Sequence, residues 1–260
     1  MKSNTKRFVQ SALRKIGFDL VRYRSPIQRH RQGAQLPGDL SPQDRAILEQ
    51  ISGFTMTSIE RQAALISSMR YVTERRLHGC FVECGVWRGG SSMAAALTLQ
   101  QEGQTDRELY LFDTFEGMTP PTDADKTADG TLAKRHLEQD VFKAGVWCVA
   151  KLPDVQHNMR STGYPTERIH YVRGPVETTI PSRAPSGPIA MLRLDTDWYE
   201  STKHELLHLF PLLAEGGVLI IDDYGHWDGA RQAVDEYLDC LPRKFYLHRV
   251  DYAGRLLVKL

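Results

Sequence analysis

The sequence predicts an α/β fold with a mostly parallel sheet and helices on both faces. Short apolar runs alternate with helix-length segments, which is the order typical of β-α-β units. Residues 189–194 and 218–221 are apolar on both faces apart from Arg193, as strands buried in a parallel sheet are. Both runs end abruptly in acidic residues. Since ligands bind beyond the carboxyl ends of parallel strands, we expect the site at that edge of the sheet.

Three acids follow these two runs. Asp195 follows the first, Asp222 and Asp223 follow the second, and residues 201–215 between them are predicted as a crossover helix that Pro211 shortens. Three converging carboxylates repel one another, which favours a bound cation. Their oxygens suit Mg²⁺, Ca²⁺ or Mn²⁺ better than zinc. The alternative is that the acids only cap the following helices.

Two further strand ends carry chemistry. Glu83 and Gly85 close one apolar run, and the glycine turn leads to Ser91 at a helix start, where backbone N–H groups meet ligands. Glu83 disfavours a phosphate and favours a cationic or hydroxyl-bearing ligand. Asp113 ends the next run, a position that commonly binds ribose hydroxyls. Close helix packing and a turn cap are the structural alternatives.

Helix signals precede this region. Ser41 followed by Pro42 predicts a helix start. Thr57 and Glu60 form a capping box for a second helix that reaches about residue 77. Near the end of the chain, residues 245–250 and 256–260 predict a hairpin.

We expect two parts in the chain. Residues 1–40 form a basic amphipathic arm and a linker, and residues 41–260 form the main domain with a lid-like insertion around residues 118–160. The first 33 residues carry nine Lys or Arg and one acid. Such an arm suits either contact with an anionic membrane surface or packing on its own domain or a partner. A homo-oligomer also stays open.

Composition narrows the function. A net charge of +1 gives no support for nucleic-acid binding. Four cysteines without a CxxC pair indicate a reducing compartment, and no signal peptide or membrane span is evident. We therefore expect a cytoplasmic protein.

One motif is misleading. His204, Glu205 and His208 match H-E-x-x-H, which binds zinc in metalloproteases. Here both histidines should lie opposite the apolar stripe of the crossover helix and face solvent. We expect no zinc site.

Four segments together resemble the macrocin O-methyltransferase family. They are FVECGVWRGG (81–90), LFDTFEG (111–117), LRLDTDWYEST (192–202) and IIDDY (220–224). The resemblance implies a class I fold dependent on S-adenosylmethionine (SAM): a seven-stranded, mostly parallel sheet with an antiparallel C-terminal hairpin. It also implies SAM and Mg²⁺ as cofactors.

The family's site residues map onto this sequence as follows. Asp195, Asp222 and Asp223 match the metal ligands, with Asp195 also beside the cofactor. Asp197 matches a catalytic base, and His226 is a second candidate. The expected SAM contacts are Thr57, Ser58, Glu83, Gly85, Ser91 and Asp113.

The expected function is Mg²⁺-dependent methylation of a hydroxyl on a sugar or glycosylated small molecule. A cation stabilises the developing alkoxide while a carboxylate removes the proton. One alternative is a catechol-type phenolic O-methyltransferase, which prefers a flat acceptor. Another is a non-catalytic SAM-binding or membrane-associated module.

Overall fold

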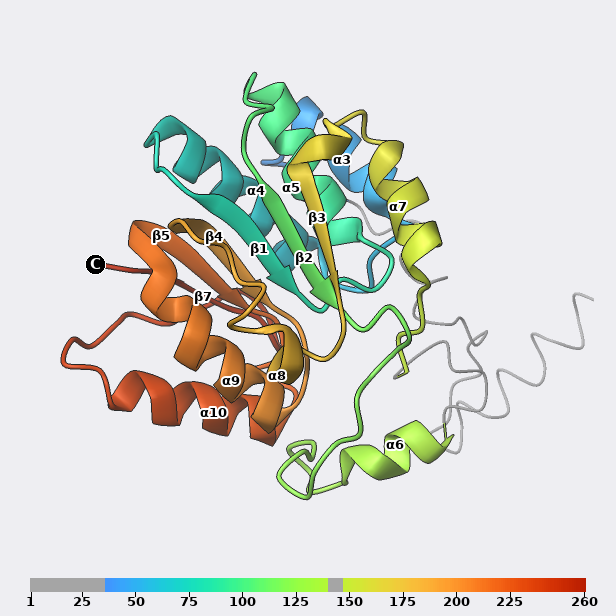
Figure 1. The fold of residues 1–260 in the computed structure, drawn as a ribbon, viewed down its shortest axis with the longest axis vertical. Helices are drawn as coiled ribbons and strands as arrows, with labels where there is room; N and C mark the ends of the chain where they lie inside the picture. The colour runs from blue at the N-terminus through green and yellow to red at the C-terminus, as the bar shows by residue number, and fades with distance from the viewer. Residues whose placement is uncertain (1–35, 140–146) are drawn as a thin grey trace, which may run out of the picture. The chain divides into compact units, whose positions relative to one another are not determined.

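The computed structural model describes residues 36–139 and 147–260. The sheet within these residues has seven strands in the order β3-β2-β1-β4-β5-β7-β6 (Figure 1). The strands are β1 (Cys80–Cys84), β2 (Leu109–Asp113), β3 (Ile169–Arg173), β4 (Ile189–Leu194), β5 (Leu213–Ile221), β6 (His248–Arg249) and β7 (Arg255–Val258). Strands β1 to β5 pair in parallel, whereas β7 is antiparallel to both β5 and β6. The predicted fold class is confirmed.

Helices cover both faces of this sheet (Figure 1). Helices α3, α4, α5 and α7 pack on one face, and α8, α9 and α10 on the other. Their bounds are α3 (Pro42–Ile51), α4 (Ile59–Glu74), α5 (Gly90–Gln101), α6 (Ala133–Gln139), α7 (Leu152–Arg160), α8 (Val176–Thr179), α9 (Tyr199–Leu209) and α10 (Asp228–Asp239), with short 3₁₀ turns η1 (Thr166–Arg168) and η2 (Phe210–Leu212).

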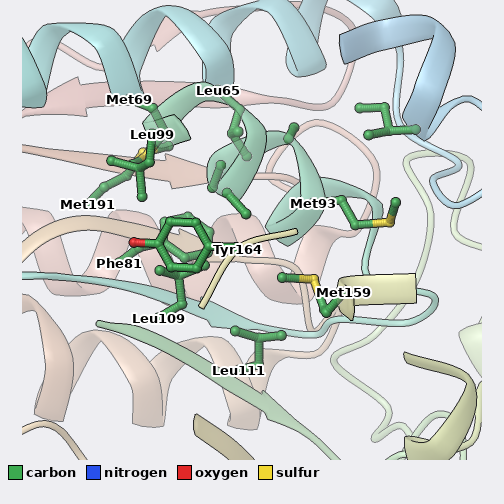
Figure 2. Packing of buried hydrophobic residues seen from close by; sticks show 14 of the residues in the cluster. Leu65, Met69, Phe81, Met93, Leu99, Leu109, Leu111, Met159, Tyr164 and Met191 are labelled. Carbon is green, nitrogen blue, oxygen red and sulfur yellow. The ribbon is translucent and has the colours of Figure 1, made fainter. Parts of the chain in front are cut away.

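The two faces of the sheet bury separate hydrophobic clusters. Successive side chains of a strand point to opposite faces, so Phe81 of β1 joins the α4–α5 side and Val82 the α9–α10 side. Figure 2 shows Phe81 and Leu109 near Leu65, Met69 and other side chains of the first cluster, all fully buried or nearly so. Burial on both faces explains why the central strands are continuous apolar runs.

The helix starts follow their capping residues. Ser41 Oγ accepts a hydrogen bond from Asp44 N at 3.0 Å at the predicted start of α3. Helix α4 begins one residue later than the capping box predicts, because Ser58 is its N-cap. Ser58 Oγ accepts from Arg61 N at 3.1 Å.

The crossover helix is shorter than predicted. Helix α9 ends at Leu209 and Pro211 lies in the 3₁₀ turn, so β5 starts at Leu213 instead of after the glycines. The reason is pairing with the last strand. Gly216 N donates to Lys259 O at 2.6 Å and Lys259 N to Gly217 O at 2.9 Å, so both glycines are paired within β5, although Gly216 has a positive φ of +79°.

The predicted insertion contributes to the core. Val155 and Met159 of α7 are fully buried, and Leu137 of α6 packs in a small cluster with Trp198 and Trp227. Residues 140–146 and the predicted basic arm lie outside the described residues. No helix within 36–139 or 147–260 is long and apolar enough to cross a membrane.

Candidate active site

Three acids meet beyond the carboxyl ends of β4 and β5. Asp195, Asp197 and Asp223 each offer a carboxylate oxygen, and these oxygens lie within 4.8 Å of one another. The pairing of Leu194 with Ile221 brings the two strand ends side by side. Asp197 has a left-handed backbone (φ +66°), and its N–H donates to Asp223 Oδ2 at 3.2 Å. Burial and the neighbouring carboxylates raise the pKa of Asp223 well above its usual value.

Asp222 is turned toward two arginines. Arg61 Nη1 pairs with Asp222 Oδ2, and Arg193 Nη2 lies 2.9 Å from Asp222 Oδ1. The Arg193 contact lacks hydrogen-bond geometry, so the buried Oδ1 atom accepts no hydrogen bond from a described residue. Two of the predicted metal ligands, Asp195 and Asp223, thus belong to the acid group. The third, Asp222, is held by ion pairs with Arg61 and Arg193.

Arg193 explains the position of Glu83. A buried charge is tolerated when it is paired, and the 3% exposed Arg193 side chain pairs with Glu83 at 2.5 Å and with Asp195 at 2.7 Å. The other Glu83 oxygen accepts from Ser92 Oγ. Burial raises the pKa of Glu83, and Arg193 opposes that shift. Both Glu83 oxygens, predicted to contact the methionine part of SAM, therefore already have protein partners.

The glycine turn after β1 and Asp113 at the end of β2 form a second part of the site. Asp113 Oδ2 accepts from Val86 N at 2.7 Å and Trp87 N at 3.0 Å, and Oδ1 accepts from Phe115 N at 2.6 Å. Gly85 has φ +82°, and a Cβ there would lie 1.9 Å from Asp195 O. Only glycine therefore allows this close approach between β1 and the loop after β4.

A hollow lies between these two parts of the site. It has a volume of about 50 Å³ and is lined by Gly85, Asp113, Glu177, Asp195 and Thr196 among others. A larger hollow of about 800 Å³ lies at the amino ends of the strands, lined by residues such as Arg107 and Pro188. None of the acids above lines the larger hollow, so we assign the site to the smaller one.

The segment before α4 contacts the loop between β6 and β7. Ser58 Oγ donates to Asp251 Oδ2 at 2.6 Å, in addition to capping α4. Thr57 is buried, with its hydroxyl 2.9 Å from that of Thr55. Ser91 is buried in the first turn of α5. The hydroxyl of Ser58 thus joins the helix start to the loop between β6 and β7.

The two candidate bases differ in surroundings. Trp227 Nε1 donates to Asp197 Oδ1 at 3.0 Å. Removal from water and the negative charge of Asp195 raise the pKa of Asp197 to about 7, a value suited to a general base. Burial, with His136 and Arg61 nearby, lowers the pKa of His226. Asp197 is thus the candidate that belongs to the acid group.

Aromatic rings extend outward from Asp197. The Trp227 ring lies 5.1 Å from Trp198 and 4.7 Å from His226, and His226 lies 5.9 Å from Tyr252, between ring centroids. Tyr252 is 65% exposed. Trp227, Tyr252 and Arg61 were not singled out from the sequence. For Trp227 the available signal was its position four residues after Asp223.

In the part of the chain that the structure describes, the two histidines of the H-E-x-x-H motif lie side by side, with ring centroids 4.4 Å apart, and no third possible metal ligand joins them. His204 Nε2 lies 2.9 Å from Ile180 O, and both histidines are half-buried, so the prediction that they face solvent was wrong for His204. Glu205 is fully buried and accepts from Thr196 Oγ1 at 3.0 Å. Successive helical side chains point about 100° apart, which sends Glu205 toward the sheet and away from the histidines.

Several known proteins are similar to this chain in sequence. The profile of the macrocin O-methyltransferase family matches residues 9–257. A tetracenomycin rhamnosyl 4'-O-methyltransferase of Streptomyces olivaceus is 36% identical over 183 residues, 70% of this chain and 67% of that protein. Mycinamicin III 3''-O-methyltransferase of Micromonospora griseorubida is 33% identical over 185 residues, 71% of this chain and 70% of that protein.

Two solved structures have a similar fold. The O-methyltransferase NovP has a TM-score of 0.68 at 29% identity, over 79% of this chain and 82% of its own. The calicheamicin methyltransferase CalS11 has a TM-score of 0.61 at 22% identity, over 95% and 96% of the two chains, and supports the fold alone. With the profile match across nearly the whole chain, these findings show that the protein is a methyltransferase of the macrocin O-methyltransferase family.

Proposed function

We propose that the protein transfers the methyl group of SAM to a hydroxyl of a sugar on a small molecule, assisted by Mg²⁺. The observation that carries the proposal is the surplus of carboxylates beyond β4 and β5, directly beside the glycine turn. The relatives named above act on sugar-bearing natural products, as their names state, and this supports a glycoside acceptor.

The donor would bind over the carboxyl ends of β1 and β2. Asp113 lines the hollow and is fixed by backbone N–H groups, so its carboxylate is oriented for hydroxyls of the ribose. Gly85 leaves room where a side chain would collide. The positive sulfonium of SAM suits a site with surplus negative charge.

The acid group fits a hard divalent cation. Its ligand atoms are all oxygens, and two come from Asp195 and Asp223. Asp222 Oδ1 lies beside them, with only an ion pair to Arg193. Oxygen ligands of this kind suit a hard cation such as Mg²⁺. When bound, the cation stabilises negative charge that develops on the acceptor oxygen.

Asp197 would take the acceptor's proton. The acceptor oxygen then forms a bond to the methyl carbon while the carbon–sulfur bond breaks and its electron pair stays on sulfur, leaving S-adenosylhomocysteine (SAH). Trp227 Nε1 donates to one Asp197 oxygen at 3.0 Å, which orients the carboxylate for accepting the proton. The exposed Tyr252 and the His226 ring beside it offer an apolar surface for the acceptor's ring.

Mass spectrometry of reactions with the purified protein tests the proposal. The protein is incubated with SAM, with either Mg²⁺ or EDTA, and with a panel of rhamnosides, other glycosides and catechols. We expect addition of one methyl group to a glycoside, and only with Mg²⁺. Exclusive methylation of catechols would replace the acceptor class, and full activity in EDTA would remove the metal from the proposal.

A further inference from the structure

Arg61 contacts the acid site although it comes from a distant part of the chain. It lies in the first turn of α4, and its Nη1 pairs with Asp222 Oδ2. The same atom lies 3.4 Å from Asp222 O, and Nε pairs with Asp251 Oδ2 at 3.0 Å. One side chain thus joins α4, the end of β5 and the turn between β6 and β7.

The position of Arg61 is fixed from several sides. Ser58 Oγ bonds both to Arg61 N and to Asp251 Oδ2. A Cβ on Gly254 would lie 2.8 Å from Arg61 Cγ and Cδ, so the turn between β6 and β7 packs directly on its side chain. The Arg61 side chain is only 18% exposed. A guanidinium held in this way cannot swing into solvent without breaking several contacts.

The acids at this site outnumber the arginines that face them. Besides Asp222 and Asp251, the charges of Asp195 and Asp223 act on Arg61. The second arginine, Arg193, already pairs with Glu83, Asp195 and Asp222. Arg61 is therefore the cation that neutralises Asp222 from the α4 side, and a divalent ion binding here meets a positive charge already in place.

We propose that Arg61 is a fixed counter-cation that stabilises the metal-free site and weakens its affinity for the divalent ion. It is a positioning residue, since it acts through Asp222 and not on the substrate. This inference rests on the proposed metal site. A merely structural role predicts that loss of Arg61 weakens metal binding, whereas a counter-cation role predicts the opposite sign.

Calorimetric titration of the full-length protein with MgCl₂, alongside thermal melts in EDTA, measures both effects. For Arg61→Gln we expect a lower melting temperature in EDTA and a dissociation constant for Mg²⁺ that is tighter by about tenfold, the size of one partly screened charge. Arg61→Lys keeps the charge and should restore the affinity of the unmodified protein.

Arg70 supplies the matched control. It lies on the same helix and also bridges two acids, Asp44 at 2.6 Å and Glu102 at 2.8 Å, neither of which belongs to the site. Arg70→Gln should lower the melting temperature and leave the dissociation constant for Mg²⁺ unchanged.

Asp251→Asn keeps the inference testable if Arg61→Gln does not fold. It frees Arg61 from one of its two acids, so Asp222 is neutralised more fully and Mg²⁺ should bind a few-fold more weakly. Equal or weaker Mg²⁺ binding by Arg61→Gln, or tighter binding by Asp251→Asn, overturns the inference and leaves the metal site standing. If the unmodified protein binds no Mg²⁺, the proposed metal site is wrong and the inference falls with it.

Discussion

The two halves of the sheet's carboxyl edge hold their acids in opposite ways. Beyond β2, both oxygens of Asp113 accept hydrogen bonds from backbone N–H groups. Beyond β4 and β5, Asp195, Asp197 and Asp223 face one another with fewer donors than oxygens. The first half has fixed dipoles and a satisfied charge, and the second has surplus negative charge. The first therefore suits neutral hydroxyls and the second a cation.

Loss of the base should give the largest effect. Asp197→Asn keeps the size and the Trp227 contact but cannot take a proton, so turnover should fall by about 10²–10⁴-fold. Asp197→Asn removes the proton acceptor and not a metal ligand, so added Mg²⁺ should not restore the rate. Steady-state kinetics across a Mg²⁺ series measures this, with His226→Gln as the comparison. Near-normal turnover by Asp197→Asn would transfer the role to His226 or to water.

Gly85, where the two halves of the edge meet, should give the next largest effect, on the stability of the fold. Gly85→Ala places a methyl group against Asp195 O at a positive φ, and we expect a loss of about 2–4 kcal/mol in the free energy of unfolding. Gly103→Ala is the control, since Gly103 has φ +69° but open space around it, and should lose about 1 kcal/mol. Equal losses in denaturant titrations would show that backbone conformation, and not the contact with Asp195, decides.

A substitution at Asp113 tests whether one half of the edge binds the methyl donor and the other half binds the metal ion. If Asp113 binds the ribose as proposed, Asp113→Ala should weaken SAH binding by about 1–3 kcal/mol through the lost charged hydrogen bonds. Mg²⁺ affinity should stay unchanged, because the acid group belongs to the other half. Calorimetry with each ligand gives both values. An unchanged dissociation constant for SAH would take Asp113 out of the donor site.

The surplus charge predicts a pH dependence of stability. The pKa of Asp197 is raised from 3.8 to about 7, so the folded protein binds a proton that the unfolded chain releases. The free energy of unfolding should therefore fall as pH rises from about 4 and level off above about 7, by about 1–3 kcal/mol. Thermal melts in EDTA should show this, and Asp197→Asn should flatten the curve. If Asp197→Asn keeps the full dependence of stability on pH, another titrating group is responsible for it.

The crossover helix should give the smallest effect. His204→Ala together with His208→Ala removes the H-E-x-x-H pair outside both halves of the site. We expect stability to change by no more than about 1 kcal/mol, mostly through the lost contact of His204 with Ile180 O. Zn²⁺ binding measured with a chromogenic chelator should be the same in the variant and the unmodified protein.

The sequence by itself determined the order of the strands and of the long helices, and the edge at which acids gather. Apolar runs buried on both faces have a local signature, and so does an acid directly after a strand, as at Asp113 and Asp195. The resemblance carried by four motifs then predicted the seven-stranded fold. Local patterns failed where pairing partners decide, as at Gly216 and Gly217, which pair with Lys259 just after β7 and so belong to β5.

Only the tertiary structure decided which charges meet. Arg193 is a single exception within an apolar strand, yet it pairs with acids from three strand ends. Arg61 carries no local signal at all, because Asp222 and Asp251 approach it from more than 150 positions away in sequence. Coulomb energies depend on distance in space and on burial, and neither is written in sequence spacing.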